Sequence, residues 1–180
     1  MRITIYDLSS TIYDGELYLF LRPEFFPMNI TIRNAEPRDV PAMLALIKEL
    51  ALYEKAPDEV ITTEASMLKD GFGEEKIYDS IVAEAKGRVV GVAIYYVVYS
   101  TWKGRIIYLD DLVVTESFRR FGIGKKLFDE LTRITKEAGV HQLRWHVLNW
   151  NMPAIKFYEK YHASLDPDWI SCKLTREQIL

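Results

Sequence analysis

Apolar residues between positions 28 and 56 follow first a strand pattern and then a helical one. The stretch Ile30 to Arg33 alternates between apolar and polar side chains, which predicts a strand. Pro37 and Pro41 follow, and both fit the first turn of a helix, where a missing N–H costs little. Apolar residues then recur at helical spacing, which predicts an amphipathic helix. They are Val40, Met43, Leu44, Ile47, Leu50 and Ala51.

Residues 57–115 begin with a helix break and continue as three strands. Pro57 ends the helical pattern, and Thr63 can cap a short helix through Lys69 that Gly71 or Gly73 closes. The expected strands span residues 78–85, 89–99 and 105–115. A tight turn at Lys86-Gly87 makes the first two strands a hairpin, and Trp102-Lys103-Gly104 forms the next turn.

The remaining residues alternate between helices and strands. A helix is expected over residues 122–138, with Gly139 as its stop. Its apolar face consists of Ile123, Leu127, Phe128, Leu131, Ile134 and Ala138. Residues 142–148 are predicted to form a strand, Asn151 can cap a helix that reaches about Tyr161, and residues 169–174 are predicted to form a last strand. This order predicts a mixed sheet with helices packed on it, in an α+β or α/β layered domain.

The composition agrees with one globular domain. The chain has 180 residues, enough for a full core, and 49% of them are hydrophobic, which argues against disorder. A net charge of −3 argues against a nucleic-acid partner. No apolar run approaches the ~20 residues of a membrane span, so we expect no membrane association. The single cysteine, Cys172, excludes an internal disulfide, suits a cytoplasmic protein, and is expected to be a small buried hydrophobe.

Residues 1–27 do not share this domain pattern. They are aromatic and apolar, but Asp7, Asp14 and Glu16 stand where a secretory signal needs positive charge and a longer apolar core. The segment is either a short hairpin that turns at Asp14-Gly15, or it is not native and the protein starts at Met28. We favour the second interpretation, because the clear domain pattern begins at Met28, and expect the domain at residues 28–180.

A basic stretch with two glycines precedes the helix 122–138. It reads Arg119-Arg120-Phe121-Gly122-Ile123-Gly124-Lys125, and Lys126 follows. The glycines let the backbone approach a bulky anion, and the helix start offers free N–H groups and partial positive charge. These features predict a cradle for a pyrophosphate group. The stretch lacks the third glycine of a dinucleotide fingerprint and the hydroxyl residue that follows the lysine of a P-loop.

Set beside Asn151 and Tyr158, the pattern Arg119-x-x-Gly122-x-Gly124 resembles the GNAT family of acetyl-CoA-dependent N-acetyltransferases. Further stretches are similar to its diamine acetyltransferase branch, the spermidine/spermine and thialysine acetyltransferases. They lie at residues 47–54 (IKELALYE), 68–73 (LKDGFG), 95–96 (YY), 108–111 (YLDD), 121–124 (FGIG) and 150–151 (WN). The resemblance covers roughly residues 28–174. It implies a mixed, mostly antiparallel central sheet with helices on both faces.

The same resemblance implies direct transfer of an acetyl group from acetyl-CoA, as co-substrate, to a primary amine in a ternary complex. The cofactor-binding residues that it implies are Leu112, Val113, Val114, Arg119, Arg120, Phe121, Gly122, Ile123, Gly124, Lys125 and Asn151. The main chain of the strand residues would pair with the pantetheine amides, and Asn151 would also be a helix cap. Tyr158 matches the family's general acid, which protonates the departing thiolate. Spacing alone favours a packing tyrosine.

An acidic and aromatic set is implied to hold the amine substrate, since carboxylates bind and steer a cation. It consists of Tyr53, Glu54, Ser100, Trp102 and Asp110. Asp110 replaces the usual glutamate and is a candidate catalytic residue that accepts the ammonium proton, while Asp111 is either a second site carboxylate or structural. The thialysine branch has Ser-Thr at Ser100, where the spermidine/spermine branch has an acidic residue. Ser100 therefore favours thialysine, lysine-like or short diamine substrates, unless it is only a turn residue.

Histidines and neighbouring residues carry weaker signals. Arg144, Trp145 and His146 align with a strand of the family's substrate pocket, of which only alternate side chains can face the site. The three histidines show no metal spacing, so we expect no metal. His162 stands where the family commonly has a helix-ending glycine, and a left-handed backbone there would cost on the order of 1 kcal/mol.

Three functions compete at this stage. They are acetylation of a small cationic amine, acetylation of a protein or peptide amine, and binding of acetyl-CoA by a non-catalytic module. Tyr158 and the acidic residues favour the first. Related enzymes are dimers, and Tyr99, Trp102 and Phe157 are candidate surface aromatics, so we expect a cytoplasmic homodimeric enzyme.

Overall fold

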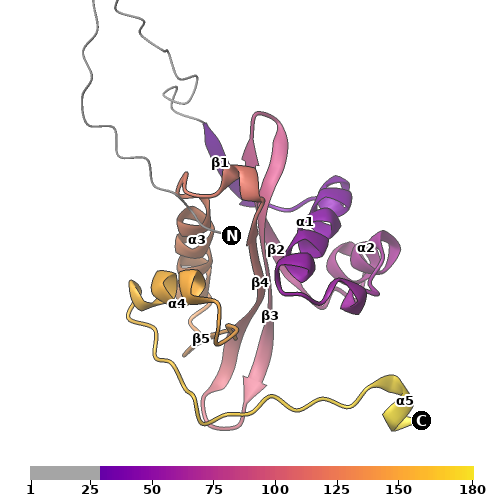
Figure 1. The fold of residues 1–180 in the computed structure, drawn as a ribbon, viewed down its shortest axis with the longest axis vertical. Helices are drawn as coiled ribbons and strands as arrows, with labels where there is room; N and C mark the ends of the chain where they lie inside the picture. The colour runs from indigo at the N-terminus through magenta and orange to yellow at the C-terminus, as the bar shows by residue number, and fades with distance from the viewer. Residues whose placement is uncertain (1–28) are drawn as a thin grey trace, which may run out of the picture.

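The central sheet of the computed structural model, which describes residues 29–180, is mixed and mostly antiparallel (Figure 1). Its five strands lie in the order β1-β2-β3-β4-β5. They span Ile30–Asn34 (β1), Asp79–Ala85 (β2), Arg88–Ser100 (β3), Gly104–Val114 (β4) and Leu143–Arg144 (β5). The first four strands pair antiparallel, and β5 pairs parallel with β4. The expectations for residues 1–27 lie outside the described residues.

Helices cover both faces of this sheet. They span Val40–Tyr53 (α1), Glu64–Phe72 (α2), Ile123–Glu137 (α3), Met152–Glu159 (α4) and Arg176–Ile179 (α5). Figure 1 shows α1 and α2 on one side of the strands and α3 and α4 on the other. One apolar cluster joins Met43 of α1 to Val92 of β3, and a second joins Leu127 of α3 to Leu109 of β4. The layered fold predicted from the sequence is therefore confirmed.

Local signals place most helix ends where the sequence predicts them. The side chain of Thr63 accepts a hydrogen bond from the backbone N–H of Ser66, and α2 begins at the next residue. Asn151 caps α4 in the same way, with its Oδ1 accepting from the N–H of Ala154. Gly139 follows α3 with φ 63°, a left-handed conformation that glycine adopts without steric cost.

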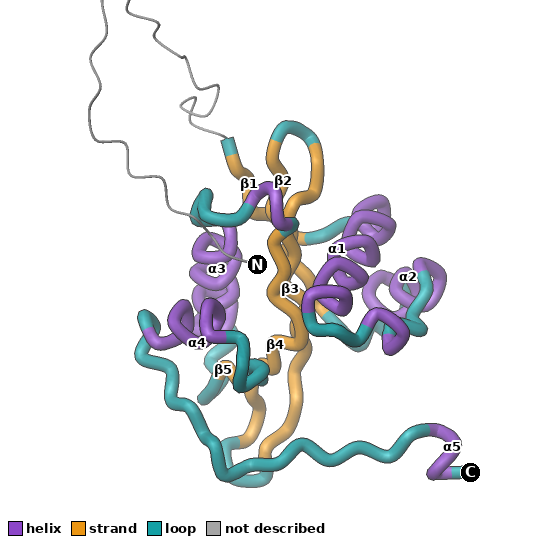
Figure 2. Tube along the Cα trace, in the orientation of Figure 1, coloured by secondary structure: helices purple, strands orange, loops and turns teal. Residues whose placement is uncertain are grey.

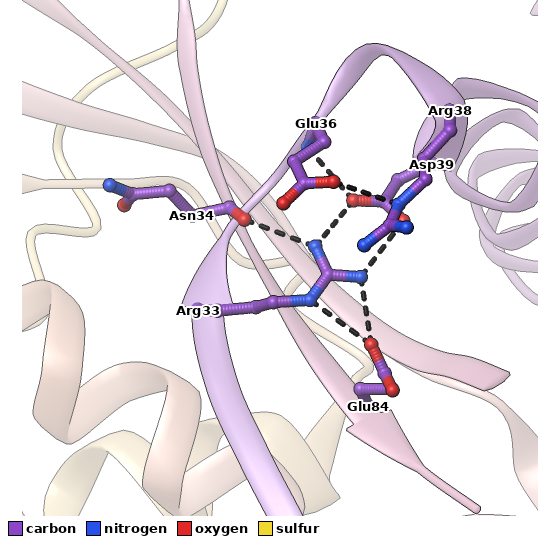
Figure 3. A network of polar contacts seen from close by, with 6 residues as sticks. All are labelled: Arg33, Asn34, Glu36, Arg38, Asp39 and Glu84. Atoms are coloured by element: carbon purple, nitrogen blue, oxygen red, sulfur yellow. Dashed lines mark hydrogen bonds and ion pairs between the residues drawn. The ribbon is translucent and has the colours of Figure 1, made fainter. Parts of the chain in front are cut away.

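An ion-pair network ties β1 to β2 and to the start of α1 (Figure 3). The guanidinium of Arg33 donates to both carboxylate oxygens of Asp39, at 2.6 and 3.0 Å, and to Oε2 of Glu84. Asp39 is only 5% exposed, and the hydrogen bond from Arg33 is the main cause that lowers the pKa of its carboxyl. A charge buried to this extent requires its partner, so the pair of Arg33 and Asp39 fixes the end of β1 against the start of α1.

The strand predicted at residues 142–148 is shorter than expected. Only Leu143 and Arg144 pair with β4, and the chain then leaves the sheet as the loop drawn in Figure 2. The predicted alternation of side chains nevertheless persists, since Trp145 and Val147 pack into the apolar cluster under α3 while His146 does not. Alternation reports which side chains are buried, but a strand also needs a neighbour for its hydrogen bonds.

The strand predicted at residues 169–174 is wrong. These residues form no ladder and run as an extended segment from α4 to α5 (Figure 2). Trp169 and Ile170 are 73% and 85% exposed, and Cys172 is exposed rather than buried. Strand-forming side chains fit a pleated, half-buried surface. Such side chains do not produce a strand where no neighbouring strand forms hydrogen bonds with their backbone.

Candidate active site

A bulge in β4 positions two adjacent carboxylates. The register between β3 and β4 shifts so that Ile94 faces Asp111 and Tyr95 faces Leu109, which makes Asp110 the extra residue. The bulge also shifts the alternation of side chains by one residue. Leu109 before it and Leu112 after it therefore both pack under α3, although they are three positions apart. Asp110 and Asp111 both stay outside this apolar cluster, although they are neighbours in sequence.

Asp110 and Asp111 form an acidic cluster with Glu54, which follows the end of α1. Burial, together with the nearby charges of Asp110 and Glu54, raises the pKa of Asp111 to about 6. Burial likewise raises the pKa of Glu54. The hydroxyl of Tyr96 donates to Oδ1 of Asp110 at 3.4 Å, and burial is the main cause that raises the pKa of Tyr96 to about 12. A partly desolvated negative cluster of this kind attracts a cation.

Residues 145 and 146 reach two different environments. His146 Nδ1 lies 2.5 Å from the hydroxyl of Tyr108, whose ring stacks beside Tyr96 at 5.4 Å. Trp145 instead packs against Tyr158, with ring centroids 4.8 Å apart. The sequence predicted that this segment contributes to the substrate pocket, but not which of its side chains lies near the acidic residues. The structure places His146, through Tyr108, next to them.

Tyr158 is buried on α4 with a free hydroxyl. The residue is 7% exposed, and its ring packs against Phe128, Trp145 and Phe157. The hydroxyl makes no hydrogen bond within residues 29–180. Because no fully buried side-chain polar atom there lacks a partner, this hydroxyl retains some exposure although its ring is buried. Burial raises the pKa of Tyr158 to about 12. The phenol therefore keeps its proton at neutral pH and is available to donate it where negative charge develops on a leaving group. Phe157, expected on the surface, packs in this core.

The strand β4 has an open edge beyond its short pairing with β5. On the side of β5 it pairs only through Ile107 and Tyr108, so from Leu109 to Val114 that edge has no partner strand among the described residues. Main-chain amides on such an edge can bond to an extended ligand. The carbonyl of Val114 already accepts a hydrogen bond from Nε of Arg119, at 3.0 Å.

The start of α3 leaves backbone N–H groups without a side-chain cap. Gly122 precedes the helix with φ 76°, a left-handed conformation, and offers no side-chain cap. The first helical N–H groups therefore have no partner within the helix, and Lys126 is the first to bond, to the carbonyl of Gly122. The first turn contains no acidic residue, and Lys125 pairs with Asp129. Basic residues at a helix N-terminus oppose its dipole, and a bound anion would reverse that cost.

Arg119 and Arg120 differ in their surroundings. Arg119 is held by its own chain, because its guanidinium contacts Glu49 at 3.6 Å and lies 5.5 Å from the ring centre of Tyr53. Arg120 has a left-handed backbone, with φ 69°, and its side chain has no ion-pair partner within residues 29–180. Phe121 is 46% exposed. The two arginines that the sequence grouped together therefore occupy separate positions.

The structure brings Tyr53 and Asn151 together across the sheet. The hydroxyl of Tyr53 donates to Oδ1 of Asn151 at 3.1 Å, and its ring lies 5.8 Å from that of Trp150. Tyr53 ends α1 and Asn151 caps α4, so this contact joins helices from opposite faces. The cap predicted for Asn151 is confirmed, and its contact with a cofactor stays a prediction.

Ser100 and Trp102 do not join the acidic cluster. They lie at the tip of the β3–β4 hairpin, where Oγ of Ser100 accepts from the backbone N–H groups of Trp102 and Lys103. Asp110 stands six positions along β4 from Gly104, the residue paired with Ser100, which corresponds to about 20 Å. Trp102 is 82% exposed. Within one chain, Ser100 therefore acts as a turn residue.

The described part of the chain contains neither a side-chain group placed to hold a metal ion nor a helix able to cross a membrane. No group of three or more His, Cys, Asp or Glu side chains in residues 29–180 is placed to hold a metal ion. No helix there is both long and apolar enough to cross a bilayer.

Comparisons with known proteins agree on one family. The model of the acetyltransferase (GNAT) family matches residues 43–163. A thialysine N-epsilon-acetyltransferase from Bos taurus is 43% identical over 142 residues, 74% of this chain and 84% of that protein. Spermidine/spermine N(1)-acetyltransferase-like protein 1 from Homo sapiens is 33% identical over 159 residues, 83% of this chain and 23% of that protein. An integron cassette protein from V. cholerae superposes with a TM-score of 0.69 at 24% identity, over 84% of this chain and 96% of its own.

Proposed function

The chain belongs to the GNAT family of acetyltransferases, and from this premise we propose that it acetylates a primary amine of a small cationic molecule, with acetyl-CoA as the donor. The family match and the identity to named acetyltransferases confirm the family and the enzyme class predicted from the sequence. The observation that carries the proposal is the acidic cluster of Glu54, Asp110 and Asp111, which adjoins the open edge of β4.

The cofactor is proposed to lie along that edge. GNAT enzymes use acetyl-CoA, and the loop before α3 offers N–H groups and Arg120 to the pyrophosphate. The pantetheine amides would meet the main chain of Leu112 and Val113, and Asn151, which accepts a hydrogen bond from Tyr53, is the further residue proposed to contact this arm. This arrangement supports a thioester near Tyr158.

The residues of this chain can then complete the transfer. The free amine attacks the carbonyl carbon of the thioester, so that a C–N bond forms as the C–S bond breaks. The thiolate sulfur takes the proton of the Tyr158 hydroxyl, and the proton that the attacking nitrogen loses as the amide forms restores the phenol. The ammonium loses its proton to a carboxylate of the acidic cluster, where Asp110 and Asp111 are the candidates. Asp111 suits this part because burial raises its pKa to about 6.

The substrate is proposed to be thialysine or a lysine-like amine, ahead of diamines and polyamines. The support is the 43% identity to a thialysine N-epsilon-acetyltransferase. Ser100 does not add to this support, because it lies far from the acidic cluster of its own chain. An assay of acetyl-CoA consumption with thialysine, lysine, putrescine, spermidine, spermine and a lysine peptide tests this. We expect the highest kcat/KM with thialysine. A preference for spermidine or for the peptide would reject the proposed substrate in favour of a competing one.

Two residues with left-handed backbones provide a matched prediction for the cofactor loop. Arg120 and His162 have φ 69° and 56°, which costs on the order of 1 kcal/mol in each. Arg120→Gly and His162→Gly should therefore both raise the free energy of unfolding, by roughly 0.5 to 1 kcal/mol. Only Arg120→Gly should weaken CoA binding, by about fivefold to tenfold. Thermal unfolding and CoA titration measure both effects. Equal CoA affinity in the two variants would remove Arg120 from the cradle.

We further propose that the protein is a cytoplasmic homodimer that uses its exposed hairpin tip. Tyr99 and Trp102 are 77% and 82% exposed there. A dimer that seats this tip near the acidic cluster of the other copy would let Ser100 and Trp102 reach the substrate, which they cannot do within one chain. Light scattering of the purified chain measures its mass, and Trp102→Ala should shift a dimer toward monomer. A monomeric wild-type chain would contradict this proposal.

A further inference from the structure

Glu49 links α1 to the loop that leads into α3. Its Oε1 accepts a hydrogen bond from the backbone N–H of Glu116 at 2.7 Å and lies 3.6 Å from Nη2 of Arg119. Glu116 begins the short 3-10 helix η4 (Glu116–Phe118), which stands between β4 and the glycines of the loop. One carboxylate therefore holds the loop at two points, from a helix on the other side of the sheet.

Arg119 is directed toward α1 by three groups. They are the carbonyl of Val114, the carboxylate of Glu49 and the ring of Tyr53. Its Nε–H is committed to the carbonyl of Val114, and its Nη2 end lies beside the carboxylate of Glu49, so the guanidinium is held on the side of α1. We propose that Glu49 and Arg119 are positioning residues, which fix the loop 119–125 so that its N–H groups and Arg120 can bind the pyrophosphate of CoA. This inference rests on the proposed function.

A groove beside the loop makes the contacts of Glu49 with Glu116 and Arg119 more important. It has a volume of about 660 Å³ and separates α1 from the β2–β3 turn and from η4. Its walls include Ala45, Glu49, Arg88, Thr115 and Ser117. Apolar packing from α1 does not fill this space, so the contacts of Glu49 hold the loop on that side. An exposed ion pair alone contributes little, whereas a charge-assisted bond to a backbone N–H contributes more.

The sign of the expected effect distinguishes positioning from simple electrostatics. A carboxylate beside a pyrophosphate site repels the ligand, so its removal alone should tighten the binding of CoA. If Glu49 positions the loop, its removal should instead weaken CoA binding. The two explanations thus predict opposite changes for the same substitution.

Calorimetric titration with CoA, together with steady-state kinetics, tests the proposal. The variants are Glu49→Gln, Arg119→Gln and the double variant. Glu137→Gln serves as the control, because Glu137 also pairs with an arginine on the surface but at the far end of α3. We expect Glu49→Gln and Arg119→Gln each to weaken CoA binding about tenfold and to raise the KM for acetyl-CoA with kcat nearly unchanged. The double variant should lose little more than either single variant, since the two residues act together.

Separate outcomes test the separate claims. Equal or tighter CoA binding by Glu49→Gln overturns the positioning role, as does a loss in the double variant that equals the sum of the single losses. Should Glu49→Gln fail to fold, Glu49→Asp keeps the charge and shortens its reach, and it should still raise the KM for acetyl-CoA selectively. A wild-type chain that does not bind CoA would contradict the proposed function itself.

Discussion

Replacement of Tyr158 by phenylalanine is expected to lower kcat by about 100-fold or more, with little change in CoA affinity. The substitution removes only the hydroxyl, which has no hydrogen-bond partner within the described residues. The ring stays packed against Phe128 and Trp145, so the stability should change little. The phenol is the group that we propose to protonate the departing thiolate, so its removal should slow that step. Stopped assays of acetyl transfer and CoA titration measure the two effects.

Tyr161→Phe is the matched control for this experiment. Tyr161 packs on the same Phe128 ring, but its hydroxyl donates to Asp129 on α3 at 2.8 Å. We expect this variant to lose some stability, because a hydrogen bond is removed, and to keep its kcat. Comparable kcat values for wild type and Tyr158→Phe would exclude Tyr158 as the general acid. A wild-type chain that binds CoA but turns over no amine would favour the non-catalytic module.

Asp111→Asn is expected to raise the KM for the amine by at least tenfold and to abolish a rise in kcat/KM near pH 6. In the folded protein, burial raises the pKa of Asp111 from 3.8 to about 6. Below that pH the carboxyl is neutral and binds an ammonium poorly, whereas above it the carboxylate attracts the cation. The wild-type rate should therefore increase as pH rises through about 6. Profiles of kcat/KM against pH for both proteins measure this limb.

The same substitution should stabilise the protein at alkaline pH. A pKa that is higher in the folded state means that the contribution of Asp111 to stability is full below pH 3.8 and is lost as pH rises through about 6. At pH 8, Asp111→Asn should thus have a free energy of unfolding on the order of 1 to 3 kcal/mol higher than wild type, and a higher unfolding temperature. At pH 4 the gain in free energy should be much smaller. Asp110→Asn is the control, because Asp110 is exposed and its substitution should lower activity without this gain. An unchanged pH profile in Asp111→Asn would mean that the limb arises elsewhere.

Patterns that depend on near neighbours in the chain were predicted well. Thr63 and Asn151 cap their helices, and Gly122, with a positive φ, precedes α3 where a helix start was expected. These features follow from hydrogen bonds and sterics within three or four residues, so the local sequence is sufficient to predict them. The family resemblance rested on the same short stretches, and the match over residues 43–163 confirms it.

Predictions that needed a partner from elsewhere in the chain were less accurate. Residues 142–148 alternate as a strand does, yet only two residues pair, because the chain diverges from β4 after Arg144. Residues 169–174 have strand-forming side chains but no edge to join, and Cys172 is exposed as a consequence. Whether a segment becomes a strand depends on the strand beside it, which sequence periodicity does not include.

The sequence by itself determined most of the elements, the family and the side chains available to the enzyme: a basic stretch with two glycines before α3, a phenol on α4 and carboxylates at the end of α1 and on β4. The tertiary structure alone decided how these groups meet. The bulge at Asp110 turns two consecutive carboxylates out of the core, the short β5 leaves an edge of β4 open, and Glu49 and Tyr53 hold Arg119 against α1. Each of these depends on register or on a contact between residues far apart in sequence, and such contacts are set by packing of the whole domain.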